Sequence, residues 1–271
     1  MTRSEKVSWL IRELKKENPG YEVIREPVNE TEKRRLLRSL MNVRWPGGVG
    51  PEFLRVQDEL LQEELEEKGI TDGGALPVIR EQYPCTAVKN DDRIVLWRGD
   101  ITTLAVDAVV NAANSQMLGC FVPCHGCIDN AIHTYAGIQL RQACADLMDL
   151  QGRPEETGLA KITPAFNLPC KYVIHTVGPI VYGSLTAREE SQLASCYQSS
   201  LALAEQNHLQ SMAFCCISTG EFHFPPHRAA EIAVQTVKNY REQTHSKIEV
   251  IFNVFKERDN ILYRNLLGAN P

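Results

Sequence analysis

Four side chains that commonly bind transition metals lie within eight positions of this 271-residue sequence, namely Cys120, Cys124, His125 and Cys127. Zinc takes thiolate and imidazole ligands in a tetrahedral shell, and a catalytic zinc has three protein ligands with one position open. Because the adjacent Cys124 and His125 cannot easily both turn toward one ion, we predict the ligands Cys120, His125 and Cys127. Two alternatives stay open: Cys124 in place of Cys120, and a closed structural zinc held by four ligands.

Polar residues flank this cysteine loop on both sides. A run typical of a buried strand, Val106 to Val110, is followed by Asn111 and Asn114, and Asp129 begins a segment typical of a helix. A strand, a polar loop and a helix in this order place a ligand at the carboxyl edge of a sheet. Asp129 therefore either takes part in chemistry beside the metal or caps the helix, a frequent role of Asp at that position.

The composition argues against several classes of protein. The formal net charge is −5, whereas nonspecific nucleic-acid binding requires a basic face. No stretch approaches the roughly 18 uninterrupted apolar residues of a membrane span, and the N-terminus is charged throughout, without the apolar region of a signal peptide. Most cysteines are therefore expected as free thiols in a reducing compartment. We predict a cytoplasmic, monomeric protein that binds neither nucleic acid nor membrane.

Residues 1–86 differ from the rest of the chain. They are rich in Glu, Lys, Arg and Leu, and apolar residues recur at helical spacing in three stretches, the first being Val7, Leu10, Ile11 and Leu14. Glycine and proline separate these stretches. We predict an N-terminal extension of three helices over residues 1–86 and one domain over residues 87–271. The extension either recognises a protein substrate or covers a sheet edge, and we favour the second role.

From residue 87 onward, strand and helix patterns alternate. We expect strands at 94–97, 106–110, 172–177, 212–217 and 248–255, and helices at 128–148, 185–207 and 229–240. Strands separated by helices of this length predict an α/β fold, with a mainly parallel sheet that is covered on both faces.

Six short motifs in this region resemble the macrodomain family, which binds ADP-ribose. The likeness extends over about residues 87–265 and keeps the family's order and spacing. The motifs are Gly99-Asp100-Ile101-Thr102, Val110-Asn111-Ala112-Ala113-Asn114, Asp129-Asn130-Ala131-Ile132-His133, Gly158-Leu159-Ala160, Val173-Ile174-His175-Thr176-Val177-Gly178-Pro179 and Ile217-Ser218-Thr219-Gly220. The resemblance implies a three-layer α/β/α fold with a mixed, mainly parallel sheet.

The sequence departs from most hydrolase-type macrodomains in one segment. Those proteins have a run of glycines before the position of Asp129, and here Gly119 to Cys127 takes its place. This segment resembles the zinc-dependent branch of the family, whose members remove ADP-ribose from proteins. In bacteria that branch is associated with a sirtuin-type ADP-ribosyltransferase and a lipoylated carrier protein. The resemblance therefore implies Zn²⁺ as a cofactor and a mono-ADP-ribosylated protein as the substrate.

The resemblance also assigns residues to the adenine and the diphosphate of ADP-ribose. Asp100 takes the position that accepts a hydrogen bond from the adenine amino group, the backbone of Ile101 meets the ring edge, and Phe255 is the candidate for stacking on the base. Backbone N–H groups in a turn between a strand and a helix bind a diphosphate. The turn expected to do so consists of Ser218, Thr219, Gly220, Glu221 and Phe222.

The distal ribose carries the bond to be cleaved. Phe224 matches the aromatic residue that lies against this ribose in relatives, and Asn114 is the candidate for direct contact, since an amide offers both a donor and an acceptor. Asn111 either contacts the ribose as well or braces the loop. We expect His133 to pack within its helix and Asp129 to stabilise positive charge at the ring in an oxocarbenium-like transition state, or to orient the attacking water.

These expectations favour a zinc-dependent hydrolase that removes mono-ADP-ribose from proteins by cleaving the bond at the distal ribose. One alternative is a module that binds ADP-ribose without cleaving it and holds a structural zinc. Another is an O-acetyl-ADP-ribose deacetylase. The cysteine loop beside Asp129 favours an enzyme over a binding module, and the sequence does not separate the two enzymes.

Overall fold

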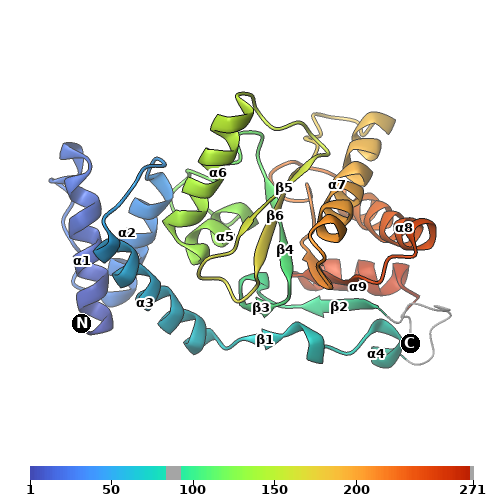
Figure 1. Ribbon diagram of the computed structural model, residues 1–271, viewed down its shortest axis with the longest axis horizontal. Coiled ribbons are helices and arrows are strands. Elements are labelled where there is room, and N and C mark those ends of the chain that lie inside the picture. Colours follow the sequence, from blue (N-terminus) through green and yellow to red (C-terminus); the bar gives the residue numbers. More distant parts are fainter. Residues whose placement is uncertain (84–92, 269–271) are drawn as a thin grey trace.

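This computed structural model describes residues 1–83 and 93–268. Three helices at the N-terminal side of the chain form one end of the described part of the molecule (Figure 1). They are α1 (Arg3–Lys16), α2 (Glu30–Val43) and α3 (Pro51–Lys68), as the sequence predicts. Their apolar faces meet in a small core that includes Leu10, Leu37 and Leu60. The boundary expected between residues 86 and 87 lies outside the described residues.

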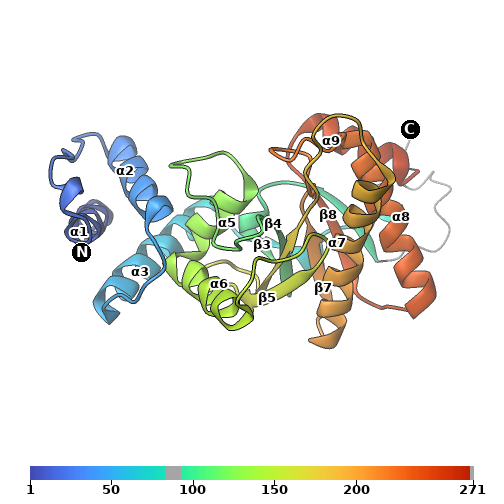
Figure 2. The ribbon, with the colours of Figure 1, turned by 90° about the horizontal axis from the view of Figure 1, so that it is seen from above.

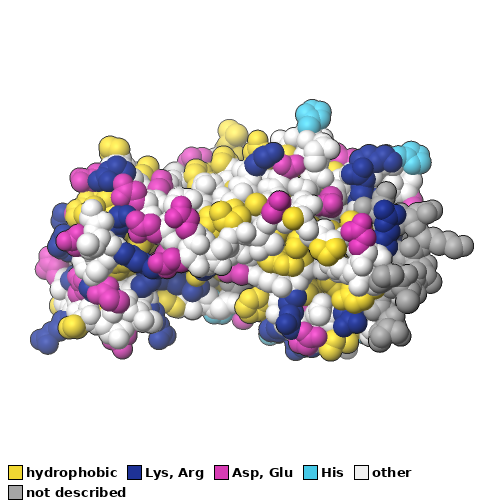
Figure 3. Space-filling view, turned by 90° about the horizontal axis from the view of Figure 1, so that it is seen from below, with side chains coloured by type: hydrophobic (Ala, Val, Ile, Leu, Met, Phe, Trp, Pro, Cys, Tyr) yellow, Lys and Arg dark blue, Asp and Glu magenta, His cyan; other side chains and the backbone are white. Residues whose placement is uncertain are grey.

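Charged side chains cover the outside of this helical end. Basic and acidic side chains lie close together over it on the face drawn in Figure 3. Arg34 of α2 donates to Glu64 of α3 over 2.8 Å, and Arg3 of α1 pairs with Glu67 of α3. None of the helices in the described part of the chain is both long and apolar enough to cross a lipid bilayer.

The rest of the described chain builds a three-layer α/β/α fold around a mixed sheet. The strands of this sheet are β2 (Ile94–Arg98), β4 (Ala108–Ala113), β5 (Ala160–Pro164), β6 (Tyr172–Val177), β7 (Ser211–Phe214) and β8 (Glu249–Val254). Their order is β2-β8-β7-β4-β6-β5, and every pair is parallel except β5 with β6. The predicted fold class is therefore confirmed.

Helices lie on both sides of this sheet. Helices α5 (Ile128–Ala136) and α6 (Ile138–Gln151) lie toward the N-terminal end, and α7 (Ala187–Gln206), α8 (Pro226–Thr244) and α9 (Glu257–Leu266) lie toward the other end (Figures 1 and 2). Three short elements precede or follow β2, namely β1 (Thr71–Asp72), which pairs with β3 (Leu104–Ala105), and α4 (Ile79–Gln82). The central strands are almost entirely buried and apolar, as expected for a parallel sheet covered on both faces.

Several predicted elements have different bounds in the structure: the strand expected at 212–217 ends at Phe214, and the helix expected at 229–240 is Pro226–Thr244. The strand expected at 106–110 is β4, which begins at Ala108 and includes Asn111. It begins later because the carboxylate of Asp107 accepts from the N–H of Gln210 over 2.6 Å, outside the strand ladder. The single helix expected at 128–148 is two helices, which break at Gly137. Strand β5 and helices α4 and α9 were not predicted.

Gly137 is held in a conformation that disfavours any other residue. Its φ is +94°, and an added Cβ would lie 2.6 Å from Gln139 Oε1 and 2.7 Å from Gln57 Nε2. We expect Gly137→Ala to lower the free energy of unfolding by about 2 kcal/mol, measured by urea denaturation. Gly48→Ala is the matched control, because a Cβ there meets nothing within 4 Å. Equal midpoints for the two variants would contradict this expectation.

The N-terminal helices pack against α5 and α6 rather than against the sheet edge, which corrects the role we favoured from the sequence. Ile138 of α6 belongs to the N-terminal core, and its N–H donates to the side chain of Gln57 in α3 over 3.0 Å. Asn42 of α2 donates to Thr134 of α5 over 3.0 Å. At the sheet edge, α4 contacts β2 through a bond from Gln82 to the carbonyl of Leu96. The edge strand β2 therefore contacts α4, which follows the three N-terminal helices in the chain.

Candidate active site

The cysteine loop, residues Gly119 to Cys127, lies between β4 and α5, and side-chain and backbone groups of α5 hold it in place. Cys127 caps α5, its Sγ accepting from the N–H of Asn130 over 3.4 Å. The buried side chain of Asn130 donates to the carbonyls of Val122 and Cys120, at 3.0 and 3.4 Å. Gly119 has a φ of +79°, and an added Cβ would lie 2.8 Å from the ring of His133. The loop conformation thus depends on the close approach of a glycine to α5.

Helix α2 of the N-terminal extension holds the other side of the cysteine loop. In Figure 2 the loop extends toward this helix. Arg38 donates to the carbonyl of His125 over 3.0 Å and to the Asn130 amide over 2.7 Å. Asn42 accepts from the N–H of Cys124 over 2.9 Å. The extension therefore fixes the backbone of the loop on which the candidate metal ligands lie.

The ligand atoms of Cys120, His125 and Cys127 lie within 4.8 Å of one another. The contact between Cys120 Sγ and His125 Nδ1 is 3.6 Å. A tetrahedral zinc with Zn–S near 2.3 Å and Zn–N near 2.05 Å separates sulfur from nitrogen by about 3.6 Å and sulfur from sulfur by about 3.8 Å. The donor set therefore suits one zinc ion, the separation between Cys120 and His125 matches the tetrahedral value, and the other separations stay within 4.8 Å. All three residues are half-buried, so solvent and ligands can reach them.

Cys124 points away from these three residues. Its backbone is in the left-handed region, with a φ of +53°, and its Sγ lies 3.3 Å from Ser39 Oγ and 3.4 Å from the carbonyl of Arg35. Both contacts are with α2. This placement supports the set Cys120, His125 and Cys127 over the alternative that contains Cys124.

The thiol of Cys127 lies in surroundings that disfavour a free thiolate. The pKa of Cys127 is raised to about 12, mainly by burial and additionally by nearby Cys120 and Asp129, while the hydrogen bond from the N–H of Asn130 opposes the shift. A bound cation reverses such a shift, since a coordinating thiol is deprotonated outright.

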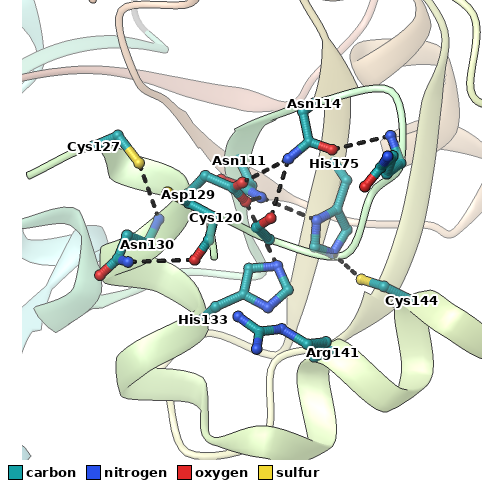
Figure 4. Close-up of polar contacts among 12 residues, drawn as sticks. Asn111, Asn114, Cys120, Cys127, Asp129, Asn130, His133, Arg141, Cys144 and His175 are labelled. Carbon is teal, nitrogen blue, oxygen red and sulfur yellow. Dashed lines mark hydrogen bonds and ion pairs between the residues drawn. The ribbon is translucent and has the colours of Figure 1, made fainter. Parts of the chain in front are cut away.

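Asp129 lies at the centre of a buried polar network (Figure 4). Its carboxylate accepts from Asn111 Nδ2 over 2.8 Å and lies 3.5 Å from Asn114 Nδ2. Burial raises the pKa of Asp129 to about 6, and the hydrogen bond from Asn111 and the charge of Arg141 oppose the shift. Asp129 follows Cys127 by two positions, and its charge contributes to the raised pKa of the Cys127 thiol, so the network lies near the candidate metal ligands.

Two buried histidines extend this network beneath Asp129. Asn111 and His175 are neighbours across β4 and β6, with Asn111 Nδ2 3.2 Å from His175 Nδ1. The other ring nitrogen of His175 lies 2.9 Å from Thr163 Oγ1 and 3.7 Å from Cys144 Sγ. Burial lowers the pKa of His133 well below its usual value, and His175 and Arg141 lower it further. The 3.5 Å contact between His133 and Asp129 is therefore no ion pair at neutral pH.

Acid is expected to destabilise the protein through His175, whose pKa burial lowers to about 3. Below a pH of about 6.5 the unfolded chain binds a proton at this residue that the native protein does not bind. The free energy of unfolding therefore decreases by up to about 1.4 kcal/mol per pH unit as the pH falls. His175→Gln removes this contribution, so urea denaturation between about pH 7.5 and about pH 5 should show a smaller decrease for the variant. Equal decreases would contradict the assignment.

The turn expected to bind a diphosphate, Ser218 to Phe222, presents a hydroxyl without a partner. Ser218 has a φ of +63°, and its buried Oγ makes no hydrogen bond within the described residues. The carbonyl of Phe222 accepts from the N–H of Val181 over 2.9 Å, which fixes the far end of the turn. Glu221 is exposed, and its carboxylate lies 3.6 Å from His125 Nε2. The turn and the cysteine loop thus face each other across the site.

The residues expected around adenine lie at the end of β2. Asp100 accepts from the N–H and hydroxyl of Thr102 through one oxygen, and the other lies 3.2 Å from Lys68 Nζ. The side chain of Ile101 is buried, so only its backbone is offered to a ligand. Phe255 follows β8 and its ring is 75% exposed. Lys68 comes from α3, so the N-terminal extension also reaches this part of the site.

Comparisons with known proteins identify the family to which this chain belongs. A family model for the Macro domain matches residues 110–233. A Treponema medium protein named protein-ADP-ribose hydrolase is 54% identical over 99% of this chain and 100% of its own length. A Staphylococcus aureus protein of the same name is 45% identical over 98% of this chain and 96% of its own. The chain belongs to the macrodomain family. The Trypanosoma brucei macrodomain in complex with ADP-ribose superposes on 89% of this chain and 96% of its own, with a TM-score of 0.64 and 28% identity.

Phe224 does not face the site in the way expected, whereas Asn111 takes one of the two roles expected of it. Phe224 is only 1% exposed and packs in the main core, because its N–H donates to the carbonyl of Ser218 and closes the turn over it. This burial argues against a contact between its ring and the distal ribose. Asn111 is fully buried under Asp129, which fits the bracing role, whereas Asn114 is half-buried at the end of β4.

Sequence reasoning missed several residues that support the site. Arg38, Asn42 and Lys68 come from the N-terminal helices, and no local pattern links them to the cysteine loop. His175 and Arg141 carried a signal, since each places a polar group in an otherwise apolar pattern, and both are buried. Such a signal predicts a buried partner without saying which residue it is.

Proposed function

We propose that this macrodomain removes mono-ADP-ribose from modified proteins by hydrolysis, with Zn²⁺ bound by Cys120, His125 and Cys127. The observation that carries the proposal is that these three ligand atoms lie within 4.8 Å of one another, near the buried carboxylate of Asp129, whose charge acts on the Cys127 thiol. The relatives named protein-ADP-ribose hydrolase support the same activity over the full length of the chain.

The described residues divide the work on ADP-ribose between binding and chemistry. The carboxylate of Asp100 accepts a hydrogen bond from the adenine amino group, and the exposed side chain of Phe255 stacks on the base. Backbone N–H groups of residues 218–222, with the unpartnered hydroxyl of Ser218, hold the diphosphate. These contacts place the distal ribose at Asn114, at the carboxyl end of β4, where Asp129 and the cysteine loop meet.

Cleavage occurs between C1 of the distal ribose and the modified side chain. Positive charge develops at the ring in an oxocarbenium-like transition state, and the Asp129 carboxylate stabilises it or orients the attacking water. Asn111 fixes the carboxylate in position through its 2.8 Å hydrogen bond. A bound zinc ion would polarise a ribose hydroxyl or lower the pKa of a bound water to about 7.

The substrate that we propose is a protein modified by a separate ADP-ribosyltransferase. The resemblance of the cysteine loop to the zinc-dependent branch supports a sirtuin-type transferase and a lipoylated carrier protein as the partners. The linkage is to a side chain of that protein, through the bond at the distal ribose.

Mass spectrometry of a mono-ADP-ribosylated protein after incubation with the macrodomain tests the proposal. We expect free ADP-ribose and the unmodified protein as products. The experiment is repeated with ADP-ribose on carboxylate, serine, arginine and cysteine side chains. Calorimetric binding of ADP-ribose without release from any linkage would identify a binding module. Release of acetate from O-acetyl-ADP-ribose alone would identify a deacetylase.

A further inference from the structure

An open groove of about 630 Å³ lies between α2, α3 and the cysteine loop. It is lined by Arg34, Arg35 and Arg38 from α2 and Lys68 from α3. Cys124 of the cysteine loop lines it as well. The chain as a whole has a formal charge of −5. A concentration of basic side chains beside the candidate site therefore runs against the overall charge.

Ion pairs neutralise only part of this charge. Arg34 donates to Glu64 over 2.8 Å, and Lys68 Nζ lies 3.2 Å from a carboxylate oxygen of Asp100, so these two residues contribute little net charge to the groove. Arg38 donates to neutral oxygens, the carbonyl of His125 and the amide of Asn130, and has no acidic partner among the residues that the structure describes. Arg35 is exposed, and its guanidinium forms no ion pair with an acidic side chain in the part of the chain that the structure describes. The part of the groove nearest the cysteine loop is therefore positively charged.

The cysteine loop separates this groove from the turn that we assign to the diphosphate. On one side, Cys124 Sγ lies 3.4 Å from the carbonyl of Arg35, and on the other, His125 Nε2 lies 3.6 Å from Glu221. The modified side chain of a substrate protein begins at the distal ribose, next to this loop. The chain that carries it therefore has the groove within reach.

We infer that the groove binds an acidic segment of the modified protein next to its ADP-ribosylated residue. The inference rests on the proposed function. Arg35 and Arg38 supply the charge that the segment complements, and electrostatic complementarity of this kind raises the rate of encounter and selects among partners. A nucleic acid fits less well, because it would extend its charge beyond the groove over a chain whose formal net charge is −5.

Two synthetic peptides of equal length, each with one ADP-ribosyl group on the same type of side chain, test this inference. Glutamates flank the modified residue in one peptide and serines flank it in the other. Release of ADP-ribose and peptide affinity by fluorescence anisotropy are measured for the native protein, Arg35→Glu and Arg12→Glu. Arg12 is a matched control, because it is an exposed arginine of α1 that does not line the groove.

We expect the native protein to favour the acidic peptide by about fivefold in kcat/KM, through KM rather than kcat, with a loss of the preference near about 0.5 M salt. Arg35→Glu should abolish the preference and leave release from the serine peptide unchanged, and Arg12→Glu should retain it. Equal kcat/KM for both peptides, or equal effects of the two variants, would overturn the inference. So would a short DNA that competes while the glutamates have no effect. If neither peptide is cleaved, the proposed function fails, and the difference in affinity still decides the role of the groove.

Discussion

Cys127→Ala is expected to abolish stoichiometric zinc binding and to lower the rate of ADP-ribose release by on the order of 10³, since a catalytic metal contributes several kcal/mol to transition-state stabilisation. The same result is expected for Cys120→Ala, because its Sγ lies 3.6 Å from His125 Nδ1 in the proposed ligand set. Metal analysis by mass spectrometry and the release assay measure the two effects. Circular dichroism shows whether each variant keeps its fold.

Cys124→Ala is the matched control for the ligand set. Its Sγ contacts Ser39 and the carbonyl of Arg35 in α2, so we expect this variant to keep both zinc and most of its activity. Loss of zinc from Cys124→Ala together with its retention in Cys120→Ala would establish the alternative ligand set. Loss of zinc without loss of activity in any folded variant would make the zinc structural.

Asp129→Asn is expected to lower kcat by about 10² to 10³, because a neutral amide cannot stabilise positive charge at the ribose ring. The amide is close in shape to the carboxylate and can still accept from Asn111, which lies 2.8 Å away. ADP-ribose affinity by calorimetry and zinc content should therefore change little. A purely structural Asp129 would instead lower the thermal midpoint and leave kcat unchanged in the folded protein.

Asp107 serves as a control that distinguishes a loss of catalysis in Asp129→Asn from a general loss of stability. Asp107 accepts from the N–H groups of Gln210 and Ser211 at the other end of the sheet's central strands. Asp107→Asn weakens these charge-assisted bonds, so we expect a loss of about 1 to 2 kcal/mol in the free energy of unfolding and an unchanged kcat. Equal losses of kcat in the two variants would show that general destabilisation causes both.

Local patterns were sufficient to predict much of the fold. The helical spacing of Val7, Leu10, Ile11 and Leu14 identified α1, and the alternation of apolar runs and helices gave a mainly parallel sheet. Strand β5 could not be found in this way, because Ala160–Pro164 is short and mostly half-buried, without a continuous apolar run. The break at Gly137 was also missed, since the apolar spacing continues across it and its positive φ is fixed by packing against Gln57 of α3.

The candidate site was predictable only where its residues are close in sequence. Cys120, His125 and Cys127 lie within one loop, so their types and spacing were enough to propose a metal site. Arg38 and Asn42 contact that loop across more than eighty positions of sequence, and no local rule connects them. The inward turn of Phe224 likewise depends on a backbone bond to Ser218, which sequence alone does not reveal.

Titration of zinc into chelator-treated protein, with release of ADP-ribose from a modified protein as the signal, tests the central claim most directly. The account predicts that activity is lost on chelation while circular dichroism is unchanged. It further predicts that activity returns in proportion to bound zinc and saturates at one ion per chain. Full activity in the metal-free, folded protein would contradict the account and leave Asp129 and Asn114 to act without a metal.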